Sequence, residues 1–176
     1  MPGVPALNKA IAGKIKYCYD TDVCPETEVT VMSGATQGLF AAIHAVIRDG
    51  DEAIVFDPAY DSYEPAVTLA GGTCKHIALV VSDEQPDFHI DWERLKDSIN
   101  DRTRLIISNF PHNPTSVILT AADLDTLADV VRDTSVYLLS DEVYEHIIFD
   151  GAADVSLLKN DELLQRTFVF SSFGKT

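Results

Sequence analysis

Lys175 and Asp141 are the residues whose chemical types and surroundings could support covalent catalysis. Lys175 ends the segment S-S-F-G-K, directly after an apolar run. A lysine held in a cleft at a strand end is partly desolvated, which lowers its pKa and lets the amine form a Schiff base. Asp141 ends another apolar run, in S-D-E-V-Y. A carboxylate buried there needs a partner, and a protonated ring nitrogen would serve, with Tyr144 near enough to share the site.

Three further segments have the composition of a ligand-binding site. The small residues of S-G-A-T-Q-G (33–38) would let the first N–H groups of a helix approach a phosphate. The candidate phosphate contacts are Gly34, Ala35 and Thr36. Tyr60 offers a flat ring that could stack on a planar cofactor. Asn113, in N-F-P-H-N-P-T, can donate side-chain N–H groups between two prolines that fix the chain direction.

Each segment also has an ordinary structural explanation. A plain helix N-cap explains the glycine-containing segment about as well as a phosphate cradle does. Simple packing accounts for Tyr63 and, taken alone, for Tyr60, and an asparagine–proline turn accounts for the surroundings of Asn113. An acid that caps the next helix is a better explanation for Glu142 than for Asp141. The functional interpretation therefore depends on the segments occurring together.

Helix and strand patterns alternate along the whole chain. Apolar spacing and end signals predict helices at 5–19, 35–48, 60–70, 91–99, from Thr120 onward, and near 155–165. Apolar, β-branched runs predict strands at 29–34, 53–58, 74–80, 104–111, 136–142 and 167–173. A polar link at 82–91 joins the third strand to its helix. The sequence T-A-A-D from Thr120 is a capping box variant with aspartate in place of glutamate.

Apolar strands separated by helices predict one domain of the α/β class, with a mostly parallel sheet in a three-layer α/β/α arrangement. Ligands of such sheets bind beyond the carboxyl ends of the strands. The polar segments described above stand at those ends, so we expect Gly34, Thr36, Tyr60, Asn113, Asp141 and Lys175 to face one cleft.

Composition excludes several classes of function. The net charge of −15 argues against nucleic acid as a partner. Three cysteines without a C-x-x-C pair indicate reduced thiols, and the histidines lack the spacing of a zinc site. The sequence shows neither a membrane-spanning run nor a signal peptide, which predicts a cytoplasmic protein without a membrane partner.

Taken together and in this order, the segments resemble fold-type-I enzymes that use pyridoxal 5'-phosphate (PLP), the class I/II aminotransferases. Within them the chain looks most similar to the branch of methionine aminotransferases and kynurenine/glutamine transaminases. The resemblance implies that Lys175 forms the Schiff base with the cofactor and later moves a proton. It implies that Asp141 pairs with the pyridinium nitrogen.

The resemblance also assigns the remaining cofactor contacts. Asn113 and Tyr144 match the residues that hydrogen-bond the phenolic oxygen of the ring, and Tyr60 matches the stacked aromatic residue. The phosphate contacts are then Gly34, Ala35, Thr36 and Ser172. Such an enzyme transfers an amino group from an amino acid, methionine-like or aromatic in this branch, to a 2-oxo acid.

The chain departs from the family in two respects. Ser116 stands where the family motif usually reads N-P-T-G. Family members also have a segment before the region matching Gly3, and a small C-terminal domain whose arginine clamps the substrate carboxylate. We therefore expect 1–176 to be a partial cofactor-binding large domain, inactive alone, whose full-length form is a homodimer. We also expect a gap in the sheet between 167–173 and 29–34, since the family strand that lies there would follow Lys175.

Two alternatives stay open on sequence grounds. A lyase of the C–S type can use the same fold and cofactor. A truncated relic or interaction module would keep the fold without turnover.

Overall fold

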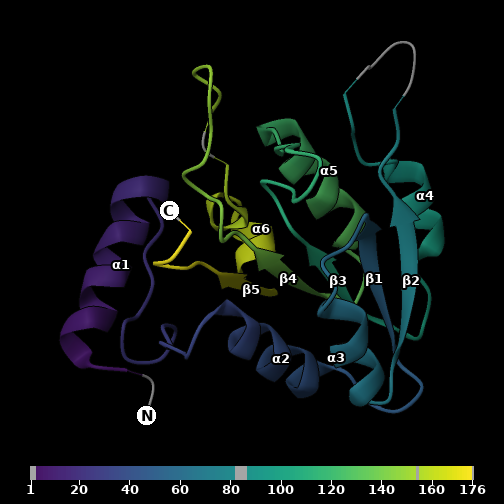
Figure 1. The fold of residues 1–176 in the computed structure, drawn as a ribbon, viewed down its shortest axis with the longest axis horizontal. Helices are drawn as coiled ribbons and strands as arrows, with labels where there is room; N and C mark the ends of the chain where they lie inside the picture. Colours follow the sequence, from purple (N-terminus) through teal and green to yellow (C-terminus); the bar gives the residue numbers. More distant parts are fainter. Residues whose placement is uncertain (1–2, 82–86, 154, 176) are drawn as a thin grey trace.

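A parallel sheet forms the centre of the molecule in the computed structural model, which describes residues 3–81, 87–153 and 155–175 (Figure 1). The sheet has five strands in the order β2-β1-β3-β4-β5. All four neighbouring pairs run parallel. The strands are β1 Glu52–Asp57, β2 Thr73–Ala78, β3 Thr103–Ser108, β4 Tyr137–Asp141 and β5 Thr167–Phe170. The predicted α/β class with a parallel sheet is confirmed.

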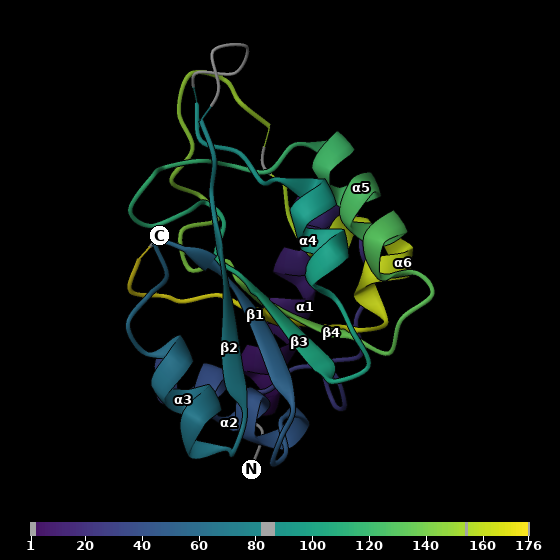
Figure 2. The same ribbon diagram turned by 90° about the vertical axis from the view of Figure 1, so that its right-hand side faces the viewer.

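Helices cover both faces of this sheet, as Figure 2 shows. The helices are α1 Pro5–Tyr19, α2 Ala35–Val46, α3 Tyr63–Leu69, α4 Trp92–Ser98, α5 Ala121–Val131, the 3-10 turn η1 Leu157–Lys159 and α6 Asp161–Leu164. One face packs on α2 and α3, and the opposite face packs on α4, α5, η1 and α6. Helix α1 stands beyond β5, at the end of the molecule opposite to β2 (Figure 1).

The central strands are buried on both faces, which explains their continuous apolar runs. In β3, Ile106 faces the cluster under α4 and α5, whereas Leu105 and Ile107 face the cluster under α2 and α3. All three are at most 1% exposed. Burial of each such side chain contributes about 1.5–3 kcal/mol, so these runs stabilise both layers at once.

Local sequence signals predicted some helix boundaries correctly and missed others. The predicted capping box at α5 is present: the Thr120 hydroxyl accepts a hydrogen bond from the Asp123 N–H, and the Asp123 carboxylate accepts one from the Thr120 N–H. Helix α3 begins three residues later than the predicted 60–70. The predicted helix near 155–165 is split into η1 and α6. Residues 82–86 of the predicted polar link lie outside the described residues.

The predicted strand at 29–34 is wrong, since the structure assigns no strand to these residues. Strands of the described chain pair only within the order given above, so 29–34 and β5 do not pair directly. Side chains hold the segment instead. The Asn8 amide donates to the carbonyl oxygen of Val29 at 3.1 Å, and Met32 and Phe170 flank Gly38 of α2. A β-branched run becomes a strand only where a neighbour completes its backbone hydrogen bonds.

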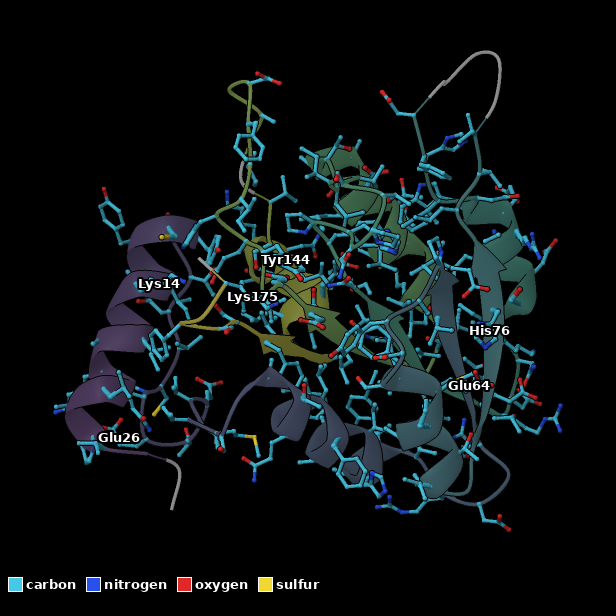
Figure 3. All side chains as sticks on the ribbon, viewed as in Figure 1. Lys14, Glu26, Glu64, His76, Tyr144 and Lys175 are labelled. Atoms are coloured by element: carbon cyan, nitrogen blue, oxygen red, sulfur yellow. The ribbon has the colours of Figure 1, made fainter. Side chains whose placement is uncertain are left out.

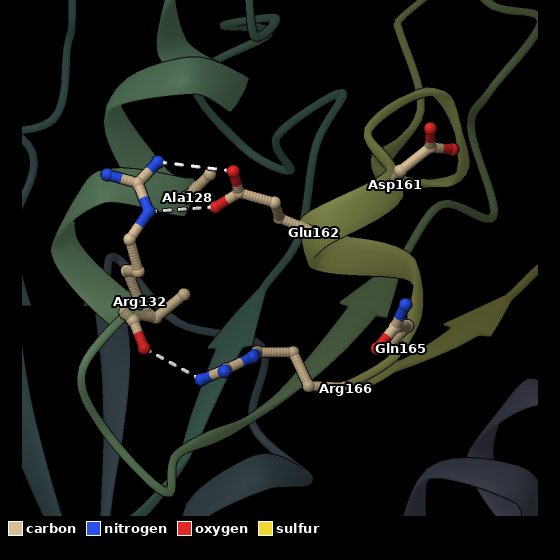
Figure 4. A pocket seen from close by; sticks show the side chains of 7 residues that line it. Ala128, Arg132, Asp161, Glu162, Gln165 and Arg166 are labelled. Carbon is tan, nitrogen blue, oxygen red and sulfur yellow. Dashed lines mark hydrogen bonds and ion pairs between the residues drawn. The ribbon is translucent and has the colours of Figure 1, made fainter.

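A surface hollow of about 270 Å³ lies between α5 and α6 (Figure 4). Its charged groups bond to one another and to the backbone. The Arg132 guanidinium donates to Glu162 at 3.0 and 3.3 Å. Arg166, just before β5, donates to the carbonyl oxygens of Val131 and Thr134 at 2.7 and 3.0 Å. These bonds join α5 to α6 and β5, which explains the hollow as part of the scaffold.

Cys18, Cys24 and Cys74 are free thiols. In the described part of the chain, no helix combines the length and the apolar character needed to cross a bilayer. The same residues contain no group of three or more His, Cys, Asp or Glu side chains arranged to hold a metal ion.

Candidate functional site

Asp141 is a buried carboxyl group at the carboxyl end of β4, 5% exposed. Its Oδ2 accepts a hydrogen bond from the Tyr63 hydroxyl at 2.6 Å. Its Oδ1 is buried and has no hydrogen-bond partner among the described residues. Burial raises the pKa of Asp141, and the interactions with the Tyr63 hydroxyl and the backbone N–H of Val143 offset this only in part. A buried carboxyl oxygen without a partner is costly, so this atom is suited to a donor that the chain itself does not supply.

Tyr63 is a site residue that the sequence interpretation missed, because it was assigned to packing. It begins α3 and is 2% exposed, yet its hydroxyl reaches Asp141 across 78 positions of sequence. Burial, followed by the nearby Asp141 charge, raises the pKa of Tyr63, so the phenol stays protonated and donates. The ring of Tyr60 meets that of Tyr63 edge to face at 5.6 Å. Tyr60 itself is 42% exposed, which leaves ring surface for another flat group.

Asn109 connects the loop after β3 to the end of β4. Its side-chain N–H donates to the carbonyl oxygen of Asp141 at 2.9 Å, and its Oδ1 accepts from the N–H of Asn113 at 3.2 Å. Asn113 and Tyr144 line one hollow of about 470 Å³, whose apolar wall includes Ile118. The structure therefore places Asn113 and Tyr144 along one hollow, and Asn109 orients the loop that carries Asn113.

Ser116 lines the same hollow and has a φ of 63°, in the left-handed region. Glycine adopts this conformation without the Cβ strain that serine experiences. We expect Ser116→Gly to raise the free energy of unfolding by about 1 kcal/mol, measured by urea denaturation. Ser116→Ala is the matched control, since it removes the same hydroxyl but keeps the Cβ. Equal effects of the two substitutions would show that the strain is absent.

Lys175 follows β5 in the turn that ends the described chain. Its Nζ lies 5.5 Å from the centroid of the Tyr144 ring. Figure 3 shows Lys175 and Tyr144 near each other, between α1 and the sheet. The Ser172 hydroxyl accepts a hydrogen bond from the N–H of Gly174 at 3.1 Å, which shapes the turn that carries the lysine.

Gly34 stands at the N-cap of α2, followed by Ala35 and Thr36 in the first turn. Gly34 has a φ of 89°, and a Cβ there would meet no atom within 4 Å, so backbone conformation and not space requires glycine. The loop 47–51 joins the end of α2 to the amino end of β1. Helix α2 therefore runs back against the strands, and its first turn points toward the carboxyl edge of the sheet.

Glu142 has the structural role that was expected of it. It is 2% exposed, and its Oε1 accepts hydrogen bonds from the Ser140 hydroxyl at 2.7 Å and from the N–H of Leu157 at 3.1 Å. Leu157 is the first residue of η1. The two neighbouring acids thus face opposite layers: Glu142 bonds to η1, whereas Asp141 bonds to Tyr63 of α3. Each has one buried oxygen without a hydrogen-bond partner among the described residues.

Known proteins resemble this chain along essentially its whole length. The model of the family "Aminotransferase class I and II" matches residues 1–176. The methionine aminotransferase of Escherichia coli is 43% identical over 176 residues, which are 100% of this chain and 45% of that protein. Human kynurenine–oxoglutarate transaminase 3 is 33% identical over 180 residues, covering 99% of this chain and 40% of that protein.

Solved structures show the same relation. The crystal structure of the E. coli protein identified as a methionine aminotransferase superposes with a TM-score of 0.94 at 42% identity, over 99% of this chain and 45% of that one. The N-succinyldiaminopimelate aminotransferase of Mycobacterium tuberculosis gives 0.92 at 37% identity, over 97% and 44%. The chain spans less than half the length of these relatives. It belongs to the class I and II aminotransferase family.

Proposed function

We propose that this chain is the cofactor-binding part of a PLP-dependent aminotransferase. The observation that carries the proposal is the buried Oδ1 of Asp141, which lacks a partner at the carboxyl edge of the sheet. A protonated ring nitrogen is the kind of donor that this atom needs. The neighbouring strand β5 leads into the turn that carries Lys175, so one ring could lie within reach of both groups.

The residues that would hold the cofactor are those predicted from the sequence, with two additions. Tyr63 keeps the Asp141 carboxyl oriented through its hydroxyl, and Asn109 fixes the loop that presents Asn113. Tyr60 offers its exposed ring for stacking, and Tyr144 lies under Lys175. The proposed phosphate contacts are Gly34, Ala35, Thr36 and Ser172.

When bound, PLP would supply an electron sink for the Cα of an amino acid. The residues of this chain would position the cofactor and move the proton. Asp141 would stay ionised beside a cationic ring nitrogen. Lys175 would hold the cofactor through its amine and accept or return the proton at Cα. Asn113 and Tyr144 would orient the ring through its phenolic oxygen.

The substrates that we propose are an amino acid donor and a 2-oxo acid acceptor. We propose a methionine-like or aromatic donor, because the relative at 43% identity is named a methionine aminotransferase and another an aromatic-amino-acid aminotransferase. Other relatives are named for aspartate or N-succinyldiaminopimelate. A PLP lyase on the same scaffold gains no support from these relatives, which are named aminotransferases. The homodimer of the full-length form and the cytoplasmic location stay predictions.

Covalent capture of PLP tests the proposal. The purified chain is incubated with PLP, reduced with borohydride and mapped by mass spectrometry. We expect a pyridoxyl group on Lys175, and none in Lys175→Ala. Asp141→Ala should lower the apparent affinity for PLP about a hundredfold, since a buried charge-paired hydrogen bond is lost.

Lys14 and Lys159 are control sites within the same protein. Labelling spread evenly over these and the other surface lysines would contradict the assignment of Lys175. Unchanged affinity in Asp141→Ala would contradict the role of Asp141 while leaving that of Lys175 standing.

A further inference from the structure

Glu145 is a buried carboxylate that joins three separate elements, although neither the sequence motifs nor the proposed cofactor contacts include it. It follows the end of β4 and is 4% exposed. Its Oε1 accepts a hydrogen bond from Lys14 Nζ of α1 at 2.6 Å. The hydroxyl of Tyr19, at the end of α1, donates to Oε2, and the hydroxyl of Ser171, directly after β5, donates to Oε1.

These partners keep the carboxylate charged. Burial acts to raise the pKa of Glu145, but the hydrogen bonds from Lys14, Ser171 and Tyr19 together outweigh it, so the pKa is lowered. An ionised acceptor forms shorter and stronger hydrogen bonds than a neutral one. The Ser171 hydroxyl therefore donates to a buried, charged group, although Ser171 itself is exposed.

The hydrogen bond from Ser171 to Glu145 lies directly after the last backbone hydrogen bond between β4 and β5. The N–H of Glu142 donates to the carbonyl oxygen of Phe170 at 2.8 Å, which continues the β4–β5 ladder as far as the end of β5. The next residue is Ser171, and Lys175 follows four positions later in an exposed turn. Glu145 also adjoins Tyr144, whose ring lies beneath the Lys175 ammonium. Figure 3 shows Lys14, Tyr144 and Lys175 on the same side of the molecule.

We propose that Glu145 is a positioning residue for Lys175. It holds the start of the lysine-bearing turn through the Ser171 hydroxyl, while Lys14 and Tyr19 fix the carboxylate from α1. Its consequence for cofactor capture rests on the proposed function, whereas the ordering of the turn does not.

Hydrogen–deuterium exchange of the cofactor-free chain tests the ordering directly. Ser171 is exposed, so Ser171→Ala removes one hydroxyl without disturbing the core. We expect the amide of Gly174, whose N–H donates to the Ser172 hydroxyl at 3.1 Å, to exchange about tenfold faster in Ser171→Ala, as for the loss of a hydrogen bond to a charged group. Ser171→Thr keeps the hydroxyl and should restore slow exchange. The thermal midpoint should fall by only a few degrees in Ser171→Ala and return to that of the parent chain in Ser171→Thr. Exchange in Ser171→Ala within about twofold of the parent chain would overturn the proposal.

Capture of PLP tests the consequence. At limiting PLP we expect reductive labelling of Lys175 to fall about tenfold in both Ser171→Ala and Glu145→Gln, with Ser171→Thr close to the parent chain. Glu93→Gln is the matched control, because Glu93 is an exposed glutamate on α4. Lys175 should be labelled to the same extent in the double variant Ser171→Ala/Glu145→Gln as in Glu145→Gln alone. Both substitutions act on the same Ser171–Glu145 hydrogen bond, so their effects should not add.

The two proposals fail in different ways. If the parent chain is not labelled at Lys175, the proposed function fails, and the exchange measurement alone decides the role of Glu145. If Lys175 is labelled equally in the parent chain and in Ser171→Ala, the positioning role is wrong and the proposed function stands.

Discussion

At pH 8, Glu142→Gln is expected to raise the free energy of unfolding by about 3 kcal/mol. Burial raises the pKa of Glu142 from 4.5 to about 7, against the hydrogen bonds from Ser156, Ser140 and the N–H of Leu157. The folded chain therefore holds a proton that the unfolded chain releases above pH 4.5. The stability that this proton contributes is fully present below 4.5 and is lost as the pH rises through about 7. Each tenfold difference in proton affinity corresponds to about 1.4 kcal/mol, which gives the stated gain for a neutral isostere.

Urea denaturation of both proteins between pH 4.5 and pH 8 measures this effect. Glutamine can still accept the hydrogen bonds of Ser140 and Leu157 through its single oxygen, so the two proteins should be nearly equally stable at pH 4.5. Their difference should then grow as the pH rises and level off above pH 7. A difference that is the same at every pH would show that Glu142 does not titrate on folding.

The same substitution at Glu52, Glu52→Gln, is expected to lower the free energy of unfolding, whereas Glu142→Gln raises it. Glu52 begins β1 and is 4% exposed, and its carboxylate pairs with Lys75 at 2.8 Å and Arg102 at 2.5 Å. Asn100 donates a further hydrogen bond at 2.9 Å. The Lys75 hydrogen bond is the largest of these influences, and together they outweigh desolvation, so the pKa of Glu52 lies below 4.5. Glu52→Gln should lower the free energy of unfolding at pH 7 by about 2 kcal/mol, because Lys75 and Arg102 lose their anionic partner and the amide offers one acceptor oxygen in place of two.

The solvent exposure of Lys75 and Arg102 limits the stability that is lost in Glu52→Gln. The side chains of Lys75 and Arg102 are 36% and 70% exposed, so water screens part of their attraction. A lowered pKa means that the contribution of Glu52 is present above 4.5 and is lost as the pH falls through the folded value. The difference between Glu52→Gln and the parent chain should therefore shrink in acid. A loss that grows in acid would contradict the ion-pair explanation.

Local physics explains why most of the fold was predictable from the sequence. The strands β1, β3 and β4 are buried on both faces, so their apolar runs are unbroken and bounded by polar or charged residues. The capping box at Thr120 needs only side chains within one helical turn. The alternation of these elements predicted the parallel sheet, and the polar residues at the strand ends predicted its carboxyl edge as the location of the site.

Tertiary structure decided what depends on partners far apart in the sequence. The run at 29–34 has strand-forming residues, but a strand also needs a neighbour to complete its hydrogen bonds, and no described segment provides one. Tyr63 is indistinguishable from a packing residue until α3 packs on the sheet and the Tyr63 hydroxyl meets Asp141 at the end of β4. Glu145 is one acid among many in the sequence, and only the meeting of α1 with the ends of β4 and β5 makes it a fixed charge. The sequence by itself determined which side chains could do the chemistry, because residue types and their local spacing do not depend on folding. The hydrogen bonds that would orient them were decided by folding, since a donor and its acceptor must be brought within about 3 Å across long stretches of chain.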